Sequence, residues 1–385
     1  MLKIDSCLIV KNEEENIKKL IEQLLIFSDE IHITDTGSTD NTINIINEFV
    51  KNNSNVYLHH FEWTMNFSEA KNYSLTCYDV KADYQFWCDG DDLLTDNLLK
   101  KIKTFKEDPQ VVNEMADIYY MNYMYNKFCS NPRSTFHVRT SLLKVSSNLK
   151  WFDPIHEYIA INNLLVLNTS YFDSNNDEYI EHQRKHYVGS RNLDIFMNME
   201  KTGWKFDSRN YYYYMAELFN NGYTKLSYYI GIECIYFDDD NIIDKINAAR
   251  LIKNIQQNKG FTSSFNNISA KQAIEYLFNK FGEDNIRGDL LYDYADIFYN
   301  EKNYDEAEKY YKKAYEYKLP TPLYGFLYND TETKINSLLQ LNMVAYYHHK
   351  DMQECIKYNR MILNIDPNNE TAKNNISIVG NNNIN

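Results

Sequence analysis

Phe86-Trp87-Cys88-Asp89-Gly90-Asp91-Asp92 is an apolar run that ends in three carboxylates. Crowded carboxylates repel one another, and each raises the pKa of its neighbours. A divalent cation removes that penalty, and oxygen ligands suit Mg²⁺ or Mn²⁺. Open α/β sheets bind ligands at the carboxyl ends of their strands. The stretch therefore predicts a metal-assisted enzyme that acts on a phosphate-bearing substrate.

The first hundred residues alternate between strand and helix patterns. We expect strands at residues 6–10, 30–34, 55–60 and 84–88, and helices at 13–27, 40–50, 68–77 and 95–105. Four β–α units in succession predict a mostly parallel sheet covered on both faces, so this part has the α/β class. Further strands are expected at residues 117–125, 135–145, 163–168 and 179–181.

After about Tyr187 the pattern is helical and repeats. The best copy spans residues 288–319 and places small and aromatic side chains where a tetratricopeptide unit has them, at Ala295, Phe298, Ala307, Tyr311 and Ala314. A looser copy has Met343, Tyr346, Cys355 and Pro367, and a weak one has Tyr212, Ala216 and Phe219. We expect an all-α repeat domain here, and generic amphipathic helix hairpins are the alternative.

Composition excludes several classes of function. The 385 residues are 44% hydrophobic and 24% charged, which is enough to bury a core. A net charge of −14 argues against a nucleic-acid partner and against adhesion to an anionic membrane. We expect no membrane span and no signal peptide, because apolar runs are too short. Six scattered cysteines without CxxC spacing predict reduced thiols and a cytoplasmic location.

The segment from Asp35 to Asp40 follows the second expected strand and opens the second helix. Helix N-termini present free N–H groups, and Gly37 permits a tight turn. Asp35 could accept the imide N–H of a uracil or a ribose hydroxyl. A well-made turn without further function is the alternative.

Four segments together resemble the ordered motifs of family-2 glycosyltransferases. They are residues 7–14 (CLIVKNEE), 35–40 (DTGSTD), 67–72 (FSEAKN) and 89–92 (DGDD). This family has the GT-A fold, a nucleotide-sugar donor and a divalent metal. The repeat region adds a resemblance to the sublancin-type peptide S-glycosyltransferases and to flagellin glycosyltransferases. The resemblance implies a GT-A domain at residues 1–190 and a tetratricopeptide-like helical repeat domain at 200–378.

The resemblance also implies roles for the motif residues. Val10, Asn12 and Glu13 would line the nucleotide-base pocket, and Asp35 would hold the uracil or ribose. Lys71 and Asn72 stand where the family has Arg-Asn near the diphosphate or base. Lysine keeps the positive charge of arginine but cannot make the bidentate hydrogen bonds of a guanidinium, which argues against a direct bidentate contact with the diphosphate. Asp89, Gly90 and Asp91 form the DxD motif, in which Asp89 reaches the ribose or metal and Asp91 the metal.

The transfer also needs a base that deprotonates the acceptor. Within residues 151–158 (WFDPIHEY), a His-Glu pair resembles one in many family members. We predict Glu157 as the base, with Asp153 as the reserve and His156 as the group that orients the base or contacts the donor. An ordinary exposed turn acid is the alternative.

A third candidate region follows the strand expected at residues 179–181. His182 is predicted to be a third metal ligand, by resemblance to family members with a histidine at this place. Arg184 or Lys185 would then reach the diphosphate. Exposed histidines in a basic loop are the alternative, and two histidines alone would make a poor zinc site.

These observations predict an inverting, metal-dependent glycosyltransferase. It would move a sugar from a UDP-sugar, with UDP-glucose or UDP-N-acetylglucosamine as the expected donors, to a Ser, Thr or Cys side chain of a peptide or protein. Mn²⁺ or Mg²⁺ is the expected cofactor, and a homodimer through the repeat domain is possible. Two alternatives stay open: transfer to a surface polysaccharide, and a non-catalytic repeat adaptor with a vestigial donor site.

Overall fold

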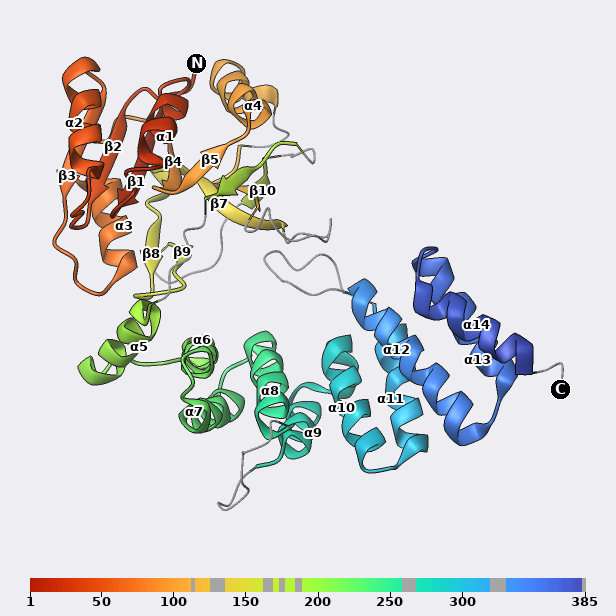
Figure 1. Cartoon of the computed structure of the whole chain (residues 1–385). Coiled ribbons are helices and arrows are strands. Elements are labelled where there is room, and N and C mark those ends of the chain that lie inside the picture. Colours follow the sequence, from red (N-terminus) through yellow and green to blue (C-terminus); the bar gives the residue numbers. More distant parts are fainter. Residues whose placement is uncertain are drawn as a thin grey trace. The chain divides into compact units, whose positions relative to one another are not determined.

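A computed structural model describes residues 1–111, 115–124, 136–161, 169–172, 177–183, 189–257, 268–318 and 330–382. The described residues divide into two compact units, one up to Gly203 and the other from Trp204 onward (Figure 1). The strand expected at residues 163–168 lies outside the described residues. No described helix combines the length and the apolar character that crossing a membrane requires.

The first unit is built on a nine-stranded sheet. Its path is β3 (Val56–His60), β2 (Ile31–Asp35), β1 (Ile4–Val10), β4 (Tyr84–Asp89), β7 (Phe136–Lys144), β6 (Ile118–Met124), β11 (Ile180–His182) and β5 (Asp92–Leu94), and β10 (Thr169–Tyr171) pairs with β6. The strands β3, β2, β1 and β4 are parallel, and β7 is antiparallel to both of its neighbours. The expected mostly parallel α/β sheet is thus confirmed.

Helices cover both faces of this sheet because successive strand residues point to opposite sides. On one face, apolar residues of α1 (Ile17–Leu24), α2 (Thr42–Asn52) and α4 (Asp96–Glu107) pack on alternate residues of β1, β2 and β4. On the other face, α3 (Phe67–Thr76) packs with a two-stranded sheet of β8 (Lys150–Phe152) and β9 (Tyr158–Ala160). Helix α5 (Arg191–Thr202) ends the unit.

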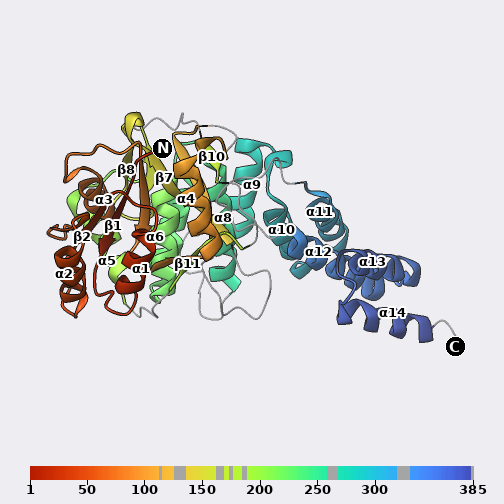
Figure 2. The ribbon, with the colours of Figure 1, turned by 90° about the horizontal axis from the view of Figure 1, so that it is seen from above.

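The second unit consists of helices that follow one another in chain order (Figure 1), and Figure 2 shows the same succession from a second direction. Their bounds are α6 (Ser208–Asn220), α7 (Thr224–Tyr236), α8 (Ile242–Gln257), α9 (Ala270–Phe281), α10 (Gly288–Asn300), α11 (Tyr304–Glu316), α12 (Asp330–Val344), α13 (Met352–Ile365) and α14 (Glu370–Asn382). Their buried side chains form one core. The helical second half of the chain is therefore confirmed.

The repeat pattern is clearest in the hairpin of α10 and α11. Three of the predicted small positions are fully buried between the helices, namely Ala295, Ala307 and Ala314. A small side chain at such a position lets two helices approach closely. The looser copy in α12 and α13 is less regular, because Cys355 is buried but Met343 is 38% exposed. Packing between neighbouring repeats therefore does not use Met343, contrary to the pattern.

Candidate functional site

Three predicted site residues meet at the carboxyl edge of the sheet. The strand register places Val10 beside Asp35 and Ile9 beside Asp89. Gly90 continues β4 at this edge, where an added Cβ would lie 2.8 Å from Cγ1 of Val10 and 3.1 Å from Cγ of Glu13. A larger residue at position 90 would therefore push the loops after β1 and β4 apart.

The loops after β1 and β2 hold each other by side chain to backbone hydrogen bonds. The carbonyl of the Asn12 side chain accepts from the N–H of Thr39 at 2.7 Å, and the N–H of Asn12 donates to Ser38 at 2.9 Å. The N–H of Glu13 donates to the hydroxyl of Thr42 at 2.7 Å. The predicted base-pocket residues Asn12 and Glu13 thus belong to one hydrogen-bonded pair of loops.

Asp35 is buried, and its carboxylate closes the turn that follows β2. It accepts from the N–H of Gly37 at 2.9 Å and from the N–H of Ser38 at 3.1 Å. Gly37 has φ of 103°, a conformation that glycine adopts without a steric penalty. The segment thus forms the expected tight turn, and this turn leaves part of the acceptor capacity of the carboxylate for a ligand.

The acids at the end of β4 form a network with a cation from β7. Arg139 donates to Asp89, and it donates to Asp92 at 3.2 Å. Asp92 is fully buried and accepts two more hydrogen bonds, from the N–H of Asp89 at 2.8 Å and from the hydroxyl of Tyr123 at 2.8 Å. The guanidinium of Arg139 also lies 4.8 Å from the ring centre of Tyr123. Asp92 is therefore a bonded anchor of the network.

Charge and burial shift the pKa values of this network in opposite directions. Burial acts to raise the pKa of Asp89, but Arg139 and Lys71 more than offset it and hold that pKa below its ordinary value. Burial raises the pKa of Asp92, although Arg139 and His182 oppose the rise. Burial lowers the pKa of His182, but hydrogen bonds and charges from Asp91 and Asp92 outweigh it and raise that pKa to about 10.

A candidate metal centre lies beside this network. One ligand atom each from Asp91, Asp92 and His182 fall within 4.8 Å of one another. Nδ1 of His182 is 3.5 Å from a carboxylate oxygen of Asp91 and 3.5 Å from one of Asp92. Two carboxylates and an imidazole fit a divalent cation such as Mn²⁺. The structure thus brings together two of the predicted ligands, Asp91 and His182, whereas Asp89 pairs with Arg139.

Lys71 lies inside the unit and contacts both parts of the predicted site. Its Nζ is 3.4 Å from the carboxylate of Glu157, and the two side chains are 7% and 12% exposed. The ammonium lies 4.5 Å from the ring centre of Trp151 and 5.3 Å from that of Trp87. Its charge also acts on Asp89. Lys71 is thus an internal cation between the DxD acid and the predicted base.

Asn72 has a structural role. Its side-chain amide donates to the carbonyl of Trp151 at 2.8 Å, and its carbonyl accepts from the N–H of Trp151 at 2.8 Å. These two bonds attach strand β8 to helix α3. Both polar groups of the Asn72 side chain therefore bond the backbone of this chain. These bonds account for an asparagine at this position without any contact to the sugar-nucleotide donor.

The loop between β8 and β9 carries the other predicted catalytic residues. Asp153 and His156 have φ of 67° and 53°, in the left-handed region that non-glycine residues rarely adopt. The carbonyl of Pro154 accepts from the N–H of Phe67 at 2.8 Å, and the His156 ring stacks on Phe196. Because the loop is held in this way, Glu157 faces Lys71. Backbone strain of this kind is typical of functional sites.

Two residues of the site were missed in the sequence, namely Arg139 and Tyr123. A lone arginine within an expected strand was the available signal, but the spacing could not place that strand next to β4. Arg184 and Lys185, the predicted diphosphate contacts, lie outside the described residues.

Comparison with known proteins identifies the first unit. The model of the family described as Glycosyl transferase family 2 matches residues 6–166. Among solved structures, S. aureus TarS 1-349 is 12% identical with a TM-score of 0.37, and the alignment covers 84% of this chain and 95% of TarS. Its complex with UDP has a TM-score of 0.36, 12% identity and the same coverage.

A second group of similar structures matches about half of the chain. YrrB, described as a TPR protein with an unusual peptide-binding site, is 14% identical with a TM-score of 0.33 over 49% of this chain and 82% of YrrB. No curated protein matches the sequence. Residues 6–166 thus form a domain of the glycosyl transferase family 2 type, and the chain carries a glycosyltransferase domain.

Proposed function

We propose that the chain is an inverting, metal-dependent glycosyltransferase that moves a sugar from a UDP-sugar to a Ser, Thr or Cys side chain of a peptide or protein. The charge balance of the site carries the metal dependence. With His182 neutral, as it must be to bind a metal, the site holds four carboxylates and two cations, Lys71 and Arg139, so two negative charges are uncompensated. The four carboxylates are Asp89, Asp91, Asp92 and Glu157. A diphosphate would be repelled from such a site, and one divalent cation removes the excess.

Asp91 and His182 would hold Mn²⁺ or Mg²⁺, and a carboxylate oxygen of Asp92 lies close enough to contribute. Asp91 and His182 are 21% and 16% exposed, so both ligands are accessible while their surroundings are largely dry. A bound cation would neutralise the charge that develops on the leaving diphosphate. Arg139 lowers the pKa of Asp89 and holds the carboxylates of Asp89 and Asp92 in place by hydrogen bonds.

The paired loops after β1 and β2 would bind the nucleotide end of the donor. Val10 ends β1 and is followed by Asn12 and Glu13 in the first loop, and Asp35 ends β2 at the start of the second loop. Because Asp35 holds the turn at Gly37 and Ser38, it presents a carboxylate of fixed orientation to a uracil imide or a ribose hydroxyl. UDP-glucose and UDP-N-acetylglucosamine are the donors to test first.

Glu157 would act as the base. It would accept the proton of the acceptor hydroxyl or thiol as the oxygen or sulfur attacks the anomeric carbon, while the bond from that carbon to the diphosphate breaks. A single displacement of this kind inverts the anomeric configuration. Lys71 orients the carboxylate of Glu157 through its ion pair at 3.4 Å. Asp153 is the reserve candidate, and His156 would orient the base or contact the donor.

The helical unit supports a polypeptide acceptor. Tetratricopeptide-like hairpins present extended surfaces that bind peptides. The pattern of buried alanines in α10 and α11 matches that architecture. The alternative acceptor is a surface polysaccharide, and a screen of acceptors would have to exclude it.

The experiment that tests the donor site is a thermal-shift panel of UDP-, GDP- and dTDP-sugars with and without Mn²⁺. We expect stabilisation by a UDP-sugar that depends on Mn²⁺ and is lost in Asp91→Asn. Asp96→Asn is the matched control, because Asp96 is exposed at the start of α4 and contacts none of these acids. Stabilisation that is equal without Mn²⁺, or equal in Asp91→Asn, would contradict the metal assignment.

The assignment of the base is tested separately by kinetics. Glu157→Gln keeps the size of the side chain and removes its basicity, so we expect unchanged donor affinity and a loss of transfer of 10²-fold or more, on the order expected for a general base. Asp153→Asn should retain most of the activity. The reverse result would assign the base to Asp153.

A further inference from the structure

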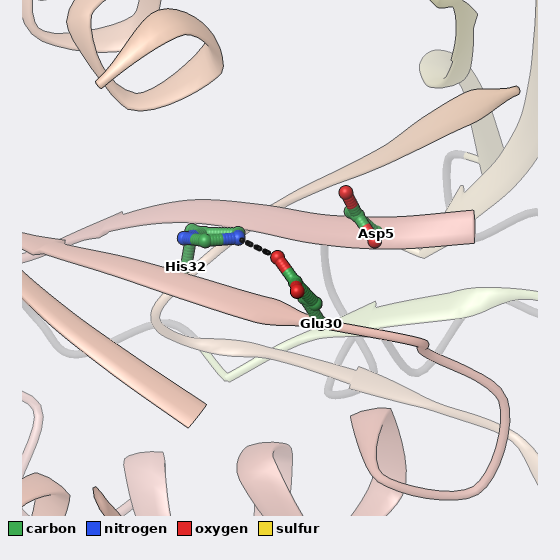
Figure 3. A group of neighbouring side chains, drawn as sticks. All are labelled: Asp5, Glu30 and His32. Atoms are coloured by element: carbon green, nitrogen blue, oxygen red, sulfur yellow. Dashed lines mark hydrogen bonds and ion pairs between the residues drawn. The ribbon is translucent and has the colours of Figure 1, made fainter. Parts of the chain in front are cut away.

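A second group of potential metal ligands lies at the opposite edge of the sheet. Asp5 is near the start of β1, Glu30 directly precedes β2, and His32 is the second residue of β2. One ligand atom from each of the three residues falls within 4.8 Å of the others. Figure 3 shows the three side chains gathered over these adjacent strands, with His32 bonded to Glu30. β1 separates Asp5 from Val10 by about 17 Å at 3.3 Å per residue, so this group is distinct from the donor site.

The imidazole of His32 is held with one nitrogen toward the carboxylates. Nε2 is 3.0 Å from Glu30, and Nδ1 is 3.0 Å from Nε2 of His59. The ring also stacks on Tyr78 and Tyr57, with ring centres 3.4 Å and 4.9 Å away. Metal-bound histidines usually have their second nitrogen hydrogen-bonded in this way, since that bond fixes the ring.

The two carboxylates lack a permanent cation. Asp5 is 4% exposed and accepts a hydrogen bond from the hydroxyl of Tyr78 at 3.1 Å. Among the described residues, the ion-pair partner of Glu30 is His32, and no lysine or arginine pairs with either carboxylate. A buried carboxylate such as Asp5 beside a second carboxylate without a paired cation is costly, and a bound ion offsets that cost.

We propose that Asp5, Glu30 and His32 form a structural site for a divalent transition ion of the Zn²⁺ class. An imidazole nitrogen with two carboxylate oxygens suits Zn²⁺ better than Mg²⁺, which prefers oxygen ligands alone. Three protein ligands leave a position for water, and the side chain of Glu30, 43% exposed, gives the ion a route from solvent. The ion ties the start of β1 to the start of β2.

The test is a calorimetric titration of the full chain with ZnCl₂, paired with thermal unfolding. Asp91→Asn serves as the background in every sample, because it weakens the other candidate metal site. In that background we expect Zn²⁺ to bind and to raise the unfolding temperature. Glu30→Gln should weaken binding by at least about tenfold, the scale on which even outer-shell losses act.

Glu22→Gln is the matched control, because it removes the same charge from an exposed position of α1. Asp5→Asn provides a second test of the site that preserves the size of a buried side chain. Absence of Zn²⁺ binding in the background chain would overturn the proposal. Equal Zn²⁺ affinity in Glu30→Gln and Glu22→Gln would overturn it as well, and neither result depends on glycosyl transfer.

Discussion

Replacing Lys71 by methionine tests whether this residue is an internal cation or a grip for the donor diphosphate. The substitution keeps a long apolar stem and removes the charge. At 3.4 Å and an effective dielectric constant near 20, the attraction between Lys71 and Glu157 is about 5 kcal/mol before desolvation is subtracted. The contacts of the ammonium with Trp151 and Trp87 add up to about 2 kcal/mol in a dry environment.

The net effect on stability is set by the carboxylate that loses its partner. Removing one member of a buried ion pair costs about 3–5 kcal/mol in free energy of unfolding. For a unit of about 200 residues this corresponds to a decrease of about 6–20 °C in unfolding temperature, at about 2–4 °C per kcal/mol. In Lys71→Met/Glu157→Gln the unpaired charge is gone, so we expect the double variant to recover about 2 kcal/mol relative to Lys71→Met.

Urea unfolding followed by tryptophan fluorescence measures these differences. Trp63, Trp87 and Trp151 belong to the first unit, and two of them contact Lys71 directly. Lys71→Arg is the control that retains the charge. A loss below about 1 kcal/mol in Lys71→Met would refute the buried ion pair, and so would a double variant that is no more stable than Lys71→Met. A loss of donor affinity with unchanged stability would favour the diphosphate role instead.

Three further predictions follow from single contacts. Asn72→Ala removes the hydrogen-bond partners of the N–H and the carbonyl of Trp151, so the free energy of unfolding should fall by about 2–4 kcal/mol. The thermal shift caused by the sugar donor should be retained. A lost thermal shift at unchanged stability would assign Asn72 to the donor site. Burial acts to raise the pKa of Asp239, but hydrogen bonds from Ser208 and Lys245 outweigh burial and lower this pKa below its ordinary value of 3.8. The ionised Asp239 therefore stabilises the fold above pH 3.8, and this stabilisation decreases as the pH falls through the pKa of the folded state. Asp239→Asn should accordingly lower stability near neutral pH and reduce the further acid-induced loss, as measured by circular dichroism; an unchanged acid profile would contradict this. Ala307→Leu overfills a fully buried helix crossing and should cost about 1–3 kcal/mol, whereas an unchanged urea midpoint would show that the hairpin has room there.

The periodic features of the sequence predicted the parts of the fold that depend on local pattern. Alternation of strand and helix gave β1 to β4 and the helices between them, and parallel pairing then required Val10, Asp35 and Asp89 to meet at one edge. Small residues at regular spacing identified the hairpin of α10 and α11. These inferences succeed because the spacing of apolar residues along the chain determines which face of a strand or helix is buried.

Contacts between distant segments could not be predicted in the same way. Arg139 bonds to Asp89 across 50 positions, and Asn72 bonds to Trp151 across 79. The first contact exists because β7 inserts beside β4 in the antiparallel direction, which is a property of sheet order. The hydrogen bonds of Asn72 to Trp151 could not be predicted either, because the sequence does not distinguish an asparagine that bonds the backbone from one that binds a ligand.

The position of Lys71 links the two halves of the proposed chemistry. Its charge lowers the pKa of Asp89 at the end of β4, and its ammonium pairs with Glu157 in the loop after β8. Helix α3 therefore connects the acids that would face the diphosphate with the group that would accept the acceptor proton. A change at Lys71 should therefore affect Asp89 and Glu157 together, whereas a change at Asp91 should leave the pair of Lys71 with Glu157 intact. Under the proposed function, the acid at the end of β4 and the base in the loop after β8 share one cation, and an arginine at this position, with its rigid planar guanidinium, would divide its hydrogen bonds between the two differently.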